Sequence, residues 1–207
     1  STGLDGTNLP DPTIATSKTQ AVDFIVDTLA SSDEKQITLC ALGPLTNIAK
    51  AFRQRPCISK SVKKIVLMGG GLFEGGNITP AAEFNIYVDP EAASEVLATG
   101  VEIVMVPLDV THKVLTSPNL IQKFENLGTK TGKAVSGLLD FFGRYDSKKY
   151  GSTGAPLHDA NVIVYLLRPD FYQGKFINVE VETVSNLTRG MTVADWWQVT
   201  DRKQNAF

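Results

Sequence analysis

The chain has 207 residues, of which 43% are hydrophobic and 20% are charged, so it can bury the core of an ordinary globular domain. Its 20 Lys and Arg against 22 Asp and Glu give a net charge of −2 at pH 7, and this excludes the broad basic field that captures nucleic acid backbones. No apolar run approaches the roughly 20 residues that span a bilayer, and the N-terminus has no signal-peptide pattern, so we expect no membrane partner and a cytoplasmic location.

The pattern along the chain predicts alternating helices and strands. Residues 1–16 are rich in glycine and proline and predict an irregular loop. Beyond it, apolar residues recur at helical spacing in some segments and form short continuous runs in others. In chain order we expect a helix over 19–30, a strand over 37–42, a helix over 45–52, a strand over 64–68, a helix over 91–98, a strand over 101–108, a mainly helical stretch over 118–150, a helix over 158–167 and a strand over 176–184.

Strands separated by helices predict an α/β fold. The run KIVLM at 64–68 is apolar throughout, which is typical of a parallel strand buried on both faces. We therefore expect one domain over residues 1–207, built as a Rossmann-like sandwich with a mostly parallel central sheet. Ligands of such sheets gather at the carboxyl ends of the strands. This rule selects the loops that follow Leu42, Met68 and Leu108.

The loop after Met68 holds Asn77, Glu83 and Asn85 within nine positions. If the segment is extended, Glu83 and Asn85 point to the same side and offer a carboxylate and an amide to a shared ligand such as a vicinal diol. The same residues also suit an ordered loop in which asparagines cap turns, and spacing alone favours this structural interpretation. The glycines at 69–71 suggest phosphate binding only weakly, since no G-x-G-x-x-G opens a helix there.

Two further groups are equally open to structural explanations. Asp159 can cap the helix that follows it, with His158 an ordinary histidine, or the pair can serve a metal and a proton transfer. Asp109 suits a residue that caps or bridges loops, and we favour that over catalysis. Trp196 and Trp197 are more typical of core or interface than of a platform for stacking a base.

Six sequence blocks nevertheless occur in a distinctive order. They are LGPLTNIA at 42–49, MGGG at 68–71, GNITPAAEFN at 76–85, DPEA at 89–92, LDVTH at 108–112 and HD at 158–159. A seventh, GMTVAD at 190–195, fits the same order. The set resembles the inosine-uridine-preferring nucleoside hydrolases over essentially the whole chain, and the resemblance reverses the preference for structural explanations.

The resemblance implies a nucleoside hydrolase fold and a sugar-binding role for the glycine-rich loop. Asn77, Glu83 and Asn85 would hold ribose hydroxyls, and Met68 and Phe84 would line the sugar pocket. The implied reaction is hydrolysis of the bond between ribose and base in a small-molecule ribonucleoside. That reaction builds oxocarbenium character on the ribose, which a nearby carboxylate such as Glu83 stabilises.

The resemblance also implies a calcium cofactor. Asp159 would be a calcium ligand, and Leu42 would contribute its backbone carbonyl, while His158 would lie near the leaving base and protonate or orient it. Calcium takes six to eight oxygen ligands and lowers the pKa of a bound water. Relatives of this kind imply a homodimer or homotetramer, and the sequence offers no handle on purine against pyrimidine preference.

One departure from the family pattern stands out. The family opens with an acidic motif of the form D-x-D-x-G-x-D-D, and no such string occurs in this chain. We therefore expect a fold that is incomplete at the N-terminus, through truncation or natural loss. The competing hypothesis is a non-catalytic ribose-binding, nucleoside-binding or scaffold remnant. Joint binding of ribose and calcium requires the carboxylates of Glu83 and Asp159 to lie on a common rim.

Overall fold

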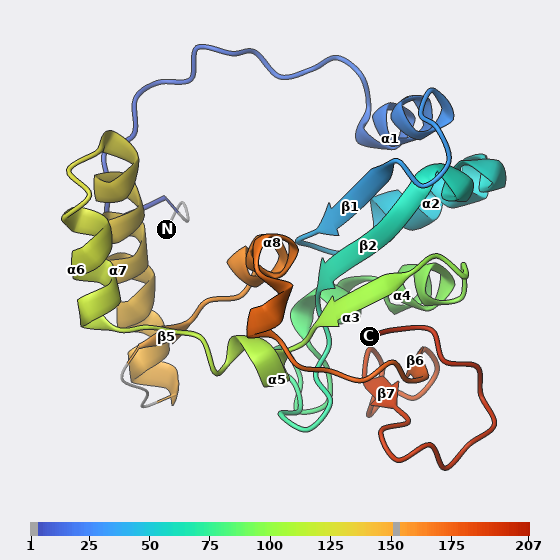
Figure 1. The fold of residues 1–207 in the computed structure, drawn as a ribbon. Coiled ribbons are helices and arrows are strands. Elements are labelled where there is room, and N and C mark those ends of the chain that lie inside the picture. Colours follow the sequence, from blue (N-terminus) through green and yellow to red (C-terminus); the bar gives the residue numbers. More distant parts are fainter. Residues whose placement is uncertain (1–3, 151–153) are drawn as a thin grey trace. The chain divides into compact units, whose positions relative to one another are not determined.

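The structure, a computed structural model, describes residues 4–150 and 154–207 (Figure 1). The chain forms two compact units. The larger, here called the sheet unit, comprises Ser17–Val110 and Asp159–Phe207. The smaller, here called the hairpin unit, comprises the described residues of 1–16 and 111–158. The expectation of a single domain over residues 1–207 stays a prediction.

A three-stranded parallel sheet forms the centre of the sheet unit. Its strands are β1 (Ile37–Ala41), β2 (Val62–Met68) and β3 (Ile103–Val106), in the order β1-β2-β3. In Figure 1 their arrowheads point the same way, with β2 in the middle. The carboxyl ends of all three strands therefore meet at one edge of the sheet, as the sequence predicts.

Helices and a small hairpin surround this sheet. One helix precedes β1, two helical segments connect β1 to β2, and two helices lie in the connection from β2 to β3. The elements are α1 (Ala21–Ala30), α2 (Thr46–Gln54), η1 (Pro56–Ser61), α3 (Phe84–Val88), α4 (Pro90–Leu97), α5 (Leu108–Thr111), α8 (Ala160–Leu167), η2 (Pro169–Phe171), β6 (Val179–Val181) and β7 (Thr192–Ala194). The strands β6 and β7 pair antiparallel as a separate two-stranded sheet.

Both faces of the central strand are buried, which explains its unbroken apolar run. Ile65 and Leu67 belong to a core cluster that includes apolar residues of α1, α2 and α4. Val66 and Met68 point to the opposite face and belong to a second cluster with Val162 of α8. Burial on both faces fixes the register of β2, and with it the position of every residue that follows Met68.

The hairpin unit contains two helices and a short two-stranded sheet. The helices are α6 (Pro118–Glu125) and α7 (Lys130–Tyr150), and the strands are β4 (Leu115–Thr116) and β5 (Ala155–Pro156). Ser117 caps α6 by accepting a hydrogen bond from the N–H of Leu120. Residues 4–16 form no helix or strand, as predicted, whereas residues 1–3 of that expected loop lie outside the described part. Among the described helices, none is long and apolar enough to cross a membrane.

Two of the strands predicted from the sequence are too long, and one helix at the carboxyl edge of the sheet was not predicted. The strand predicted over 101–108 stops at Val106, because Pro107 lacks an N–H to continue a ladder and α5 starts at Leu108. The strand predicted over 176–184 shrinks to Val179–Val181. The short helix α3 was not predicted at all, and its cause lies in the site described next.

Candidate active site

Side chains from distant parts of the sheet unit hold the loop that follows β2. The N–H of Gly70 donates to Glu83 Oε2 at 3.0 Å. The N–H of Gly71 donates to Thr192 Oγ1 at 3.0 Å, and the same hydroxyl donates to the carbonyl of Gly71 at 2.8 Å. Gly70 has a φ of 81°, a conformation that glycine adopts without strain. The glycines thus allow the backbone to approach these acceptors closely.

Asp109 holds the next three residues of the same loop. Its Oδ2 accepts from the N–H of Leu72 at 2.7 Å, and its Oδ1 accepts from Phe73 at 2.8 Å and Glu74 at 3.2 Å. The loop-bridging role expected for Asp109 is therefore confirmed. All five amides from Gly70 to Glu74 have partners within the protein, so the loop offers no cluster of N–H donors to a phosphate.

Glu83 is the most constrained carboxylate at this edge of the sheet. Its residue is 2% exposed, and its oxygens accept from the N–H groups of Gly70, Asn85 and Ile86. Two of these amides belong to the second and third residues of α3, so Glu83 is the N-cap of that helix. The extended geometry that would place Glu83 and Asn85 on the same side is not the one observed, because the chain turns into a helix directly after Glu83.

The environment of Glu83 raises its pKa. Burial is the largest cause, the hydrogen bonds from Asn85, Gly70 and Ile86 lower the pKa, and the negative charge of Asp159 raises it further. Desolvation penalises the ionised form, and a second carboxylate nearby adds repulsion. The charge of Asp159 is therefore near enough to act on Glu83, and a shared site for the two carboxylates stays a prediction.

The raised pKa predicts how the stability depends on pH. The unfolded-state pKa of a glutamate is about 4.3, so Glu83 stabilises the fold most below that value and loses this contribution as the pH rises through its raised folded-state pKa. We expect the unfolding free energy of Glu83→Gln, which cannot titrate, to rise relative to that of the wild type from about pH 4 to pH 7. Urea unfolding of both proteins in EDTA measures this. A constant difference, or one of opposite sign, contradicts the assignment.

Two asparagines near Glu83 use opposite ends of their side-chain amides in hydrogen bonds to the backbone: Asn85 uses its NH₂ group and Asn77 uses its oxygen. Asn85 donates from Nδ2 to the carbonyl of Met68 at 3.0 Å. Asn77 accepts at Oδ1 from the N–H of Phe84 at 2.9 Å. No described group donates to Asn85 Oδ1, and none accepts from Asn77 Nδ2, so the pair presents one acceptor and one donor. Met68 is buried and Phe84 is 48% exposed.

The two residues predicted to bind a metal also belong to the sheet unit. Asp159 occupies the N-cap position of α8, but its side chain makes no capping hydrogen bond there. The side chain of Asp159 therefore does not cap α8, which was one of the two roles that the sequence left open. Leu42 directly follows β1, so its backbone carbonyl lies at the carboxyl end of that strand.

His158 belongs to the hairpin unit. Its Nδ1 lies 2.9 Å from Thr111 Oγ1, and its ring meets that of His112 at a centroid distance of 6.0 Å in an edge-to-face arrangement. Thr111 is fully buried. The hydroxyl of Thr111 thereby helps to fix the orientation of the imidazole.

The described residues offer few oxygen ligands for a calcium ion. Calcium takes six to eight oxygens. Within residues 4–150 and 154–207, no three His, Cys, Asp or Glu side chains group together as a metal site, and the oxygens of Glu83 are already occupied by backbone N–H groups. Asp159 and the carbonyl of Leu42 are two donors, so the described residues alone do not fit a calcium site.

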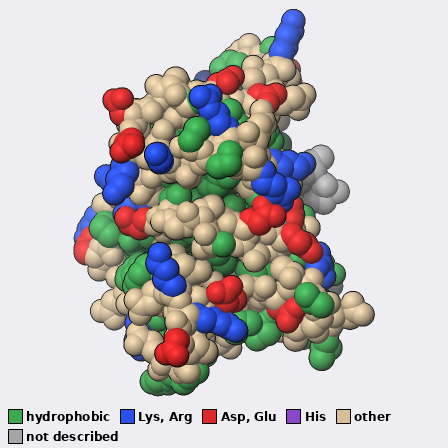
Figure 2. Space-filling model, turned by 90° about the vertical axis from the view of Figure 1, so that its right-hand side faces the viewer, with side chains coloured by type: hydrophobic (Ala, Val, Ile, Leu, Met, Phe, Trp, Pro, Cys, Tyr) green, Lys and Arg blue, Asp and Glu red, His purple; other side chains and the backbone are tan. Residues whose placement is uncertain are grey.

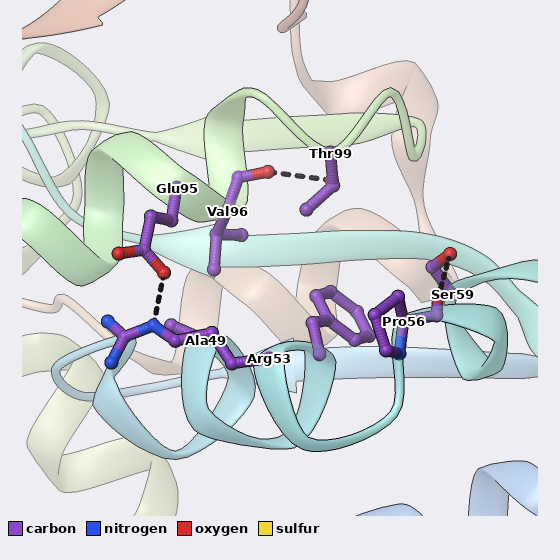
Figure 3. A pocket seen from close by; sticks show the side chains of 8 residues that line it. Ala49, Arg53, Pro56, Ser59, Glu95, Val96 and Thr99 are labelled. Atoms are coloured by element: carbon purple, nitrogen blue, oxygen red, sulfur yellow. Dashed lines mark hydrogen bonds and ion pairs between the residues drawn. The ribbon is translucent and has the colours of Figure 1, made fainter.

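A separate cavity of about 270 Å³ lies elsewhere in the sheet unit (Figure 3). Residues of α2, η1 and α4 line it, and Arg53 forms an ion pair with Glu95 at 2.5 Å on its wall. Pro56 and Ser59 precede β2 and Thr99 precedes β3, so the cavity lies toward the amino ends of the strands. None of the predicted site residues lines it.

Comparison with known proteins decides the family. The profile described as inosine-uridine preferring nucleoside hydrolase matches residues 1–207. The chain belongs to this family. It is 51% identical over 197 residues to an uncharacterized protein of Schizosaccharomyces pombe, covering 95% of the chain and 64% of that protein. It is 44% identical over 205 residues to the pyrimidine-specific ribonucleoside hydrolase RihA of Shigella boydii, covering 99% and 65%.

Solved structures of the family share the fold. The purine-preferring ribonucleoside hydrolase from Gardnerella vaginalis superimposes with a TM-score of 0.89 at 31% identity, over 99% of this chain and 64% of that one. The predicted α/β nucleoside hydrolase fold is confirmed. The chain spans 64–65% of the length of the curated relatives given above.

Sequence reasoning overlooked one residue that the structure places in the network. Thr192 lies in the block GMTVAD, which matched the family order, but no role was assigned to it. A threonine flanked by apolar residues in a short strand reads as ordinary β-sheet sequence. Only the fold shows that its buried hydroxyl contacts Gly71, a residue 121 positions away.

Proposed function

We propose that this protein hydrolyses the N-glycosidic bond of ribonucleosides, releasing ribose and the free base. The observation that carries the proposal is the carboxylate of Glu83, buried and held by three backbone N–H groups at the carboxyl edge of the sheet, within electrostatic reach of Asp159. Membership of the nucleoside hydrolase family supports it. So does the absence of free N–H donors for phosphate from Gly70 to Glu74.

The asparagines are suited to recognise a ribose diol. A sugar hydroxyl both donates and accepts a hydrogen bond. In this proposal Asn85 Oδ1 accepts from one hydroxyl and Asn77 Nδ2 donates to another, because the opposite ends of these amides are bound to Met68 and Phe84. The sugar is thus oriented by groups that cannot rotate without breaking a bond to the backbone. Met68 and the half-exposed Phe84 line its apolar side.

Glu83 supplies charge stabilisation in this mechanism. Cleavage of the bond between C1′ and the base nitrogen moves electrons onto the base and leaves positive charge on the ribose. A carboxylate whose position is fixed in advance stabilises that charge without reorganisation. Water then adds to C1′ and gives up one proton, while the departing base gains one, so that ribose and the neutral base are formed. His158, whose Nδ1 is hydrogen-bonded to Thr111 Oγ1, would protonate or orient the leaving base.

The proposal also covers a calcium cofactor, the preferred nucleobase and the oligomeric state. The cation would use Asp159 and the carbonyl of Leu42 among its ligands and would supply a more acidic water when bound, but two donors are too few for a site by themselves. The relatives are named both pyrimidine-specific and purine-preferring, so either base class stays open. A homodimer or homotetramer and a cytoplasmic location likewise stay predictions.

The test is release of reducing sugar by the full-length native protein. We expect turnover of inosine, uridine or both, loss of activity in EDTA, and recovery with calcium. The matched control is the corresponding 2′-deoxyribonucleoside, which lacks one hydroxyl of the diol and should react at least about 100-fold more slowly. Nucleoside binding without turnover would favour the non-catalytic alternative. Neither binding nor turnover of any ribonucleoside would contradict the proposal.

A further inference from the structure

Thr192 ties the β6–β7 hairpin to the glycine-rich loop through one hydroxyl. Its Oγ1 accepts from the N–H of Gly71 at 3.0 Å and donates to the carbonyl of the same residue at 2.8 Å. The side chain is 2% exposed, so water does not compete for these bonds. A single hydroxyl that satisfies both backbone groups of one residue fixes the orientation of two successive peptide planes.

The loop residue next to Gly71 contacts Glu83. Gly70 donates its N–H to Glu83 Oε2 at 3.0 Å, and a Cβ added at Gly70 would lie 3.0 Å from the side chain of Thr192. Gly70 is therefore packed between Thr192 and Glu83. A shift of the loop that breaks the bonds to Thr192 would carry away the N–H that holds the buried carboxylate.

We propose that Thr192 is a positioning residue for Glu83. It acts through Gly71 and Gly70 and holds the carboxylate where positive charge develops on the sugar. This inference rests on the proposed ribonucleoside hydrolysis. It assigns a task to the β6–β7 hairpin, which contacts no substrate in the proposed mechanism. Misplacing a catalytic group by about 1 Å costs on the order of 100-fold in rate, so the contribution is measurable.

The kinetic test compares Thr192→Val with Thr192→Ser in the full-length native protein. Valine keeps the shape and removes the hydroxyl, whereas serine keeps the hydroxyl. We expect Thr192→Val to lower kcat about 10- to 100-fold with little change in KM, because the affected interaction strengthens in the transition state. Thr192→Ser should stay within about threefold of wild type. Thr183→Val is the matched control, since the Thr183 hydroxyl makes no hydrogen bond to any described residue.

A second readout does not depend on turnover. Hydrogen exchange of the peptide that covers residues 69–74 should speed up at least about tenfold in Thr192→Val and stay unchanged in Thr192→Ser and Thr183→Val. If wild type hydrolyses no ribonucleoside, the proposed function fails while the exchange data still test the contact. Unchanged exchange overturns the inference, and so does faster exchange with wild-type kcat. If Thr192→Val does not fold, the same comparison is made with Thr192→Ala.

Discussion

Glu83→Gln should abolish most of the activity while leaving the protein folded. The change removes the negative charge proposed to stabilise the ribose cation, and removal of one preorganised electrostatic group costs about 10²- to 10³-fold in kcat. Glutamine also presents an NH₂ group where Oε1 or Oε2 accepts backbone N–H bonds. The unmet amides should cost about 1–3 kcal/mol of stability. Initial rates of sugar release and urea unfolding measure the two effects.

Glu182→Gln is the matched control. Glu182 also accepts two backbone N–H bonds, from Val184 and Ser185, and it lies on the loop between β6 and β7. Its side-chain hydrogen bonds are confined to its own loop, so the same chemical change should leave kcat within about threefold of wild type. Equal losses in the two variants would mean that the effect of Glu83→Gln is structural, and the catalytic role would then be withdrawn.

Gly71→Ala should have the largest effect on the architecture of the loop. A Cβ at this position would lie 2.0 Å from the carbonyl oxygen of Gly75, a backbone atom that cannot rotate away. We expect the free energy of unfolding to fall by about 3 kcal/mol. For a chain of this size, that change lowers Tm by about 6–12 °C. Activity should fall as well, because Gly71 is the residue that Thr192 holds. Calorimetry and the sugar-release assay report both.

Gly43→Ala provides the comparison for that substitution. Gly43 follows β1, and a Cβ added there meets no atom within 4 Å. Its stability should change by no more than about 0.5 kcal/mol. If Gly71→Ala is as stable as Gly43→Ala, the loop adopts a conformation different from the one described, and the Thr192 contact would lose its basis.

Elements of the fold could be predicted from the sequence where a single local pattern, such as an apolar run, determined the structure. The run at 64–68 could only be a strand buried on both faces, and β2 occupies Val62–Met68. The helix predicted over 91–98 is α4, which begins at Pro90, a residue suited to the first position of a helix. Prediction failed where a side chain decided the local structure, as in α3, where Glu83 caps the helix. Periodicity over five residues carries too little information to reveal such a helix.

The site was accessible only in part for a similar reason. The rule of strand carboxyl ends selected the loop that follows Met68, and the family resemblance selected Asn77, Glu83 and Asn85 within it, whose role stays a prediction. Neither showed which end of each amide is free for a ligand, since that depends on the backbone groups of Met68 and Phe84. The surface gave little help, because acidic and basic side chains are mixed on the face drawn in Figure 2. Long-range contacts such as Thr192 with Gly71 leave no local signal.

The five consecutive amides from Gly70 to Glu74 also constrain how this segment can evolve. Each amide is matched to a particular oxygen, and the oxygens come from Glu83, Thr192 and Asp109, which the rest of the fold holds in place. Inserting or deleting one residue would move every later amide to the wrong oxygen. Divergence here should therefore proceed by side-chain replacement at constant length, with insertions confined to other connections.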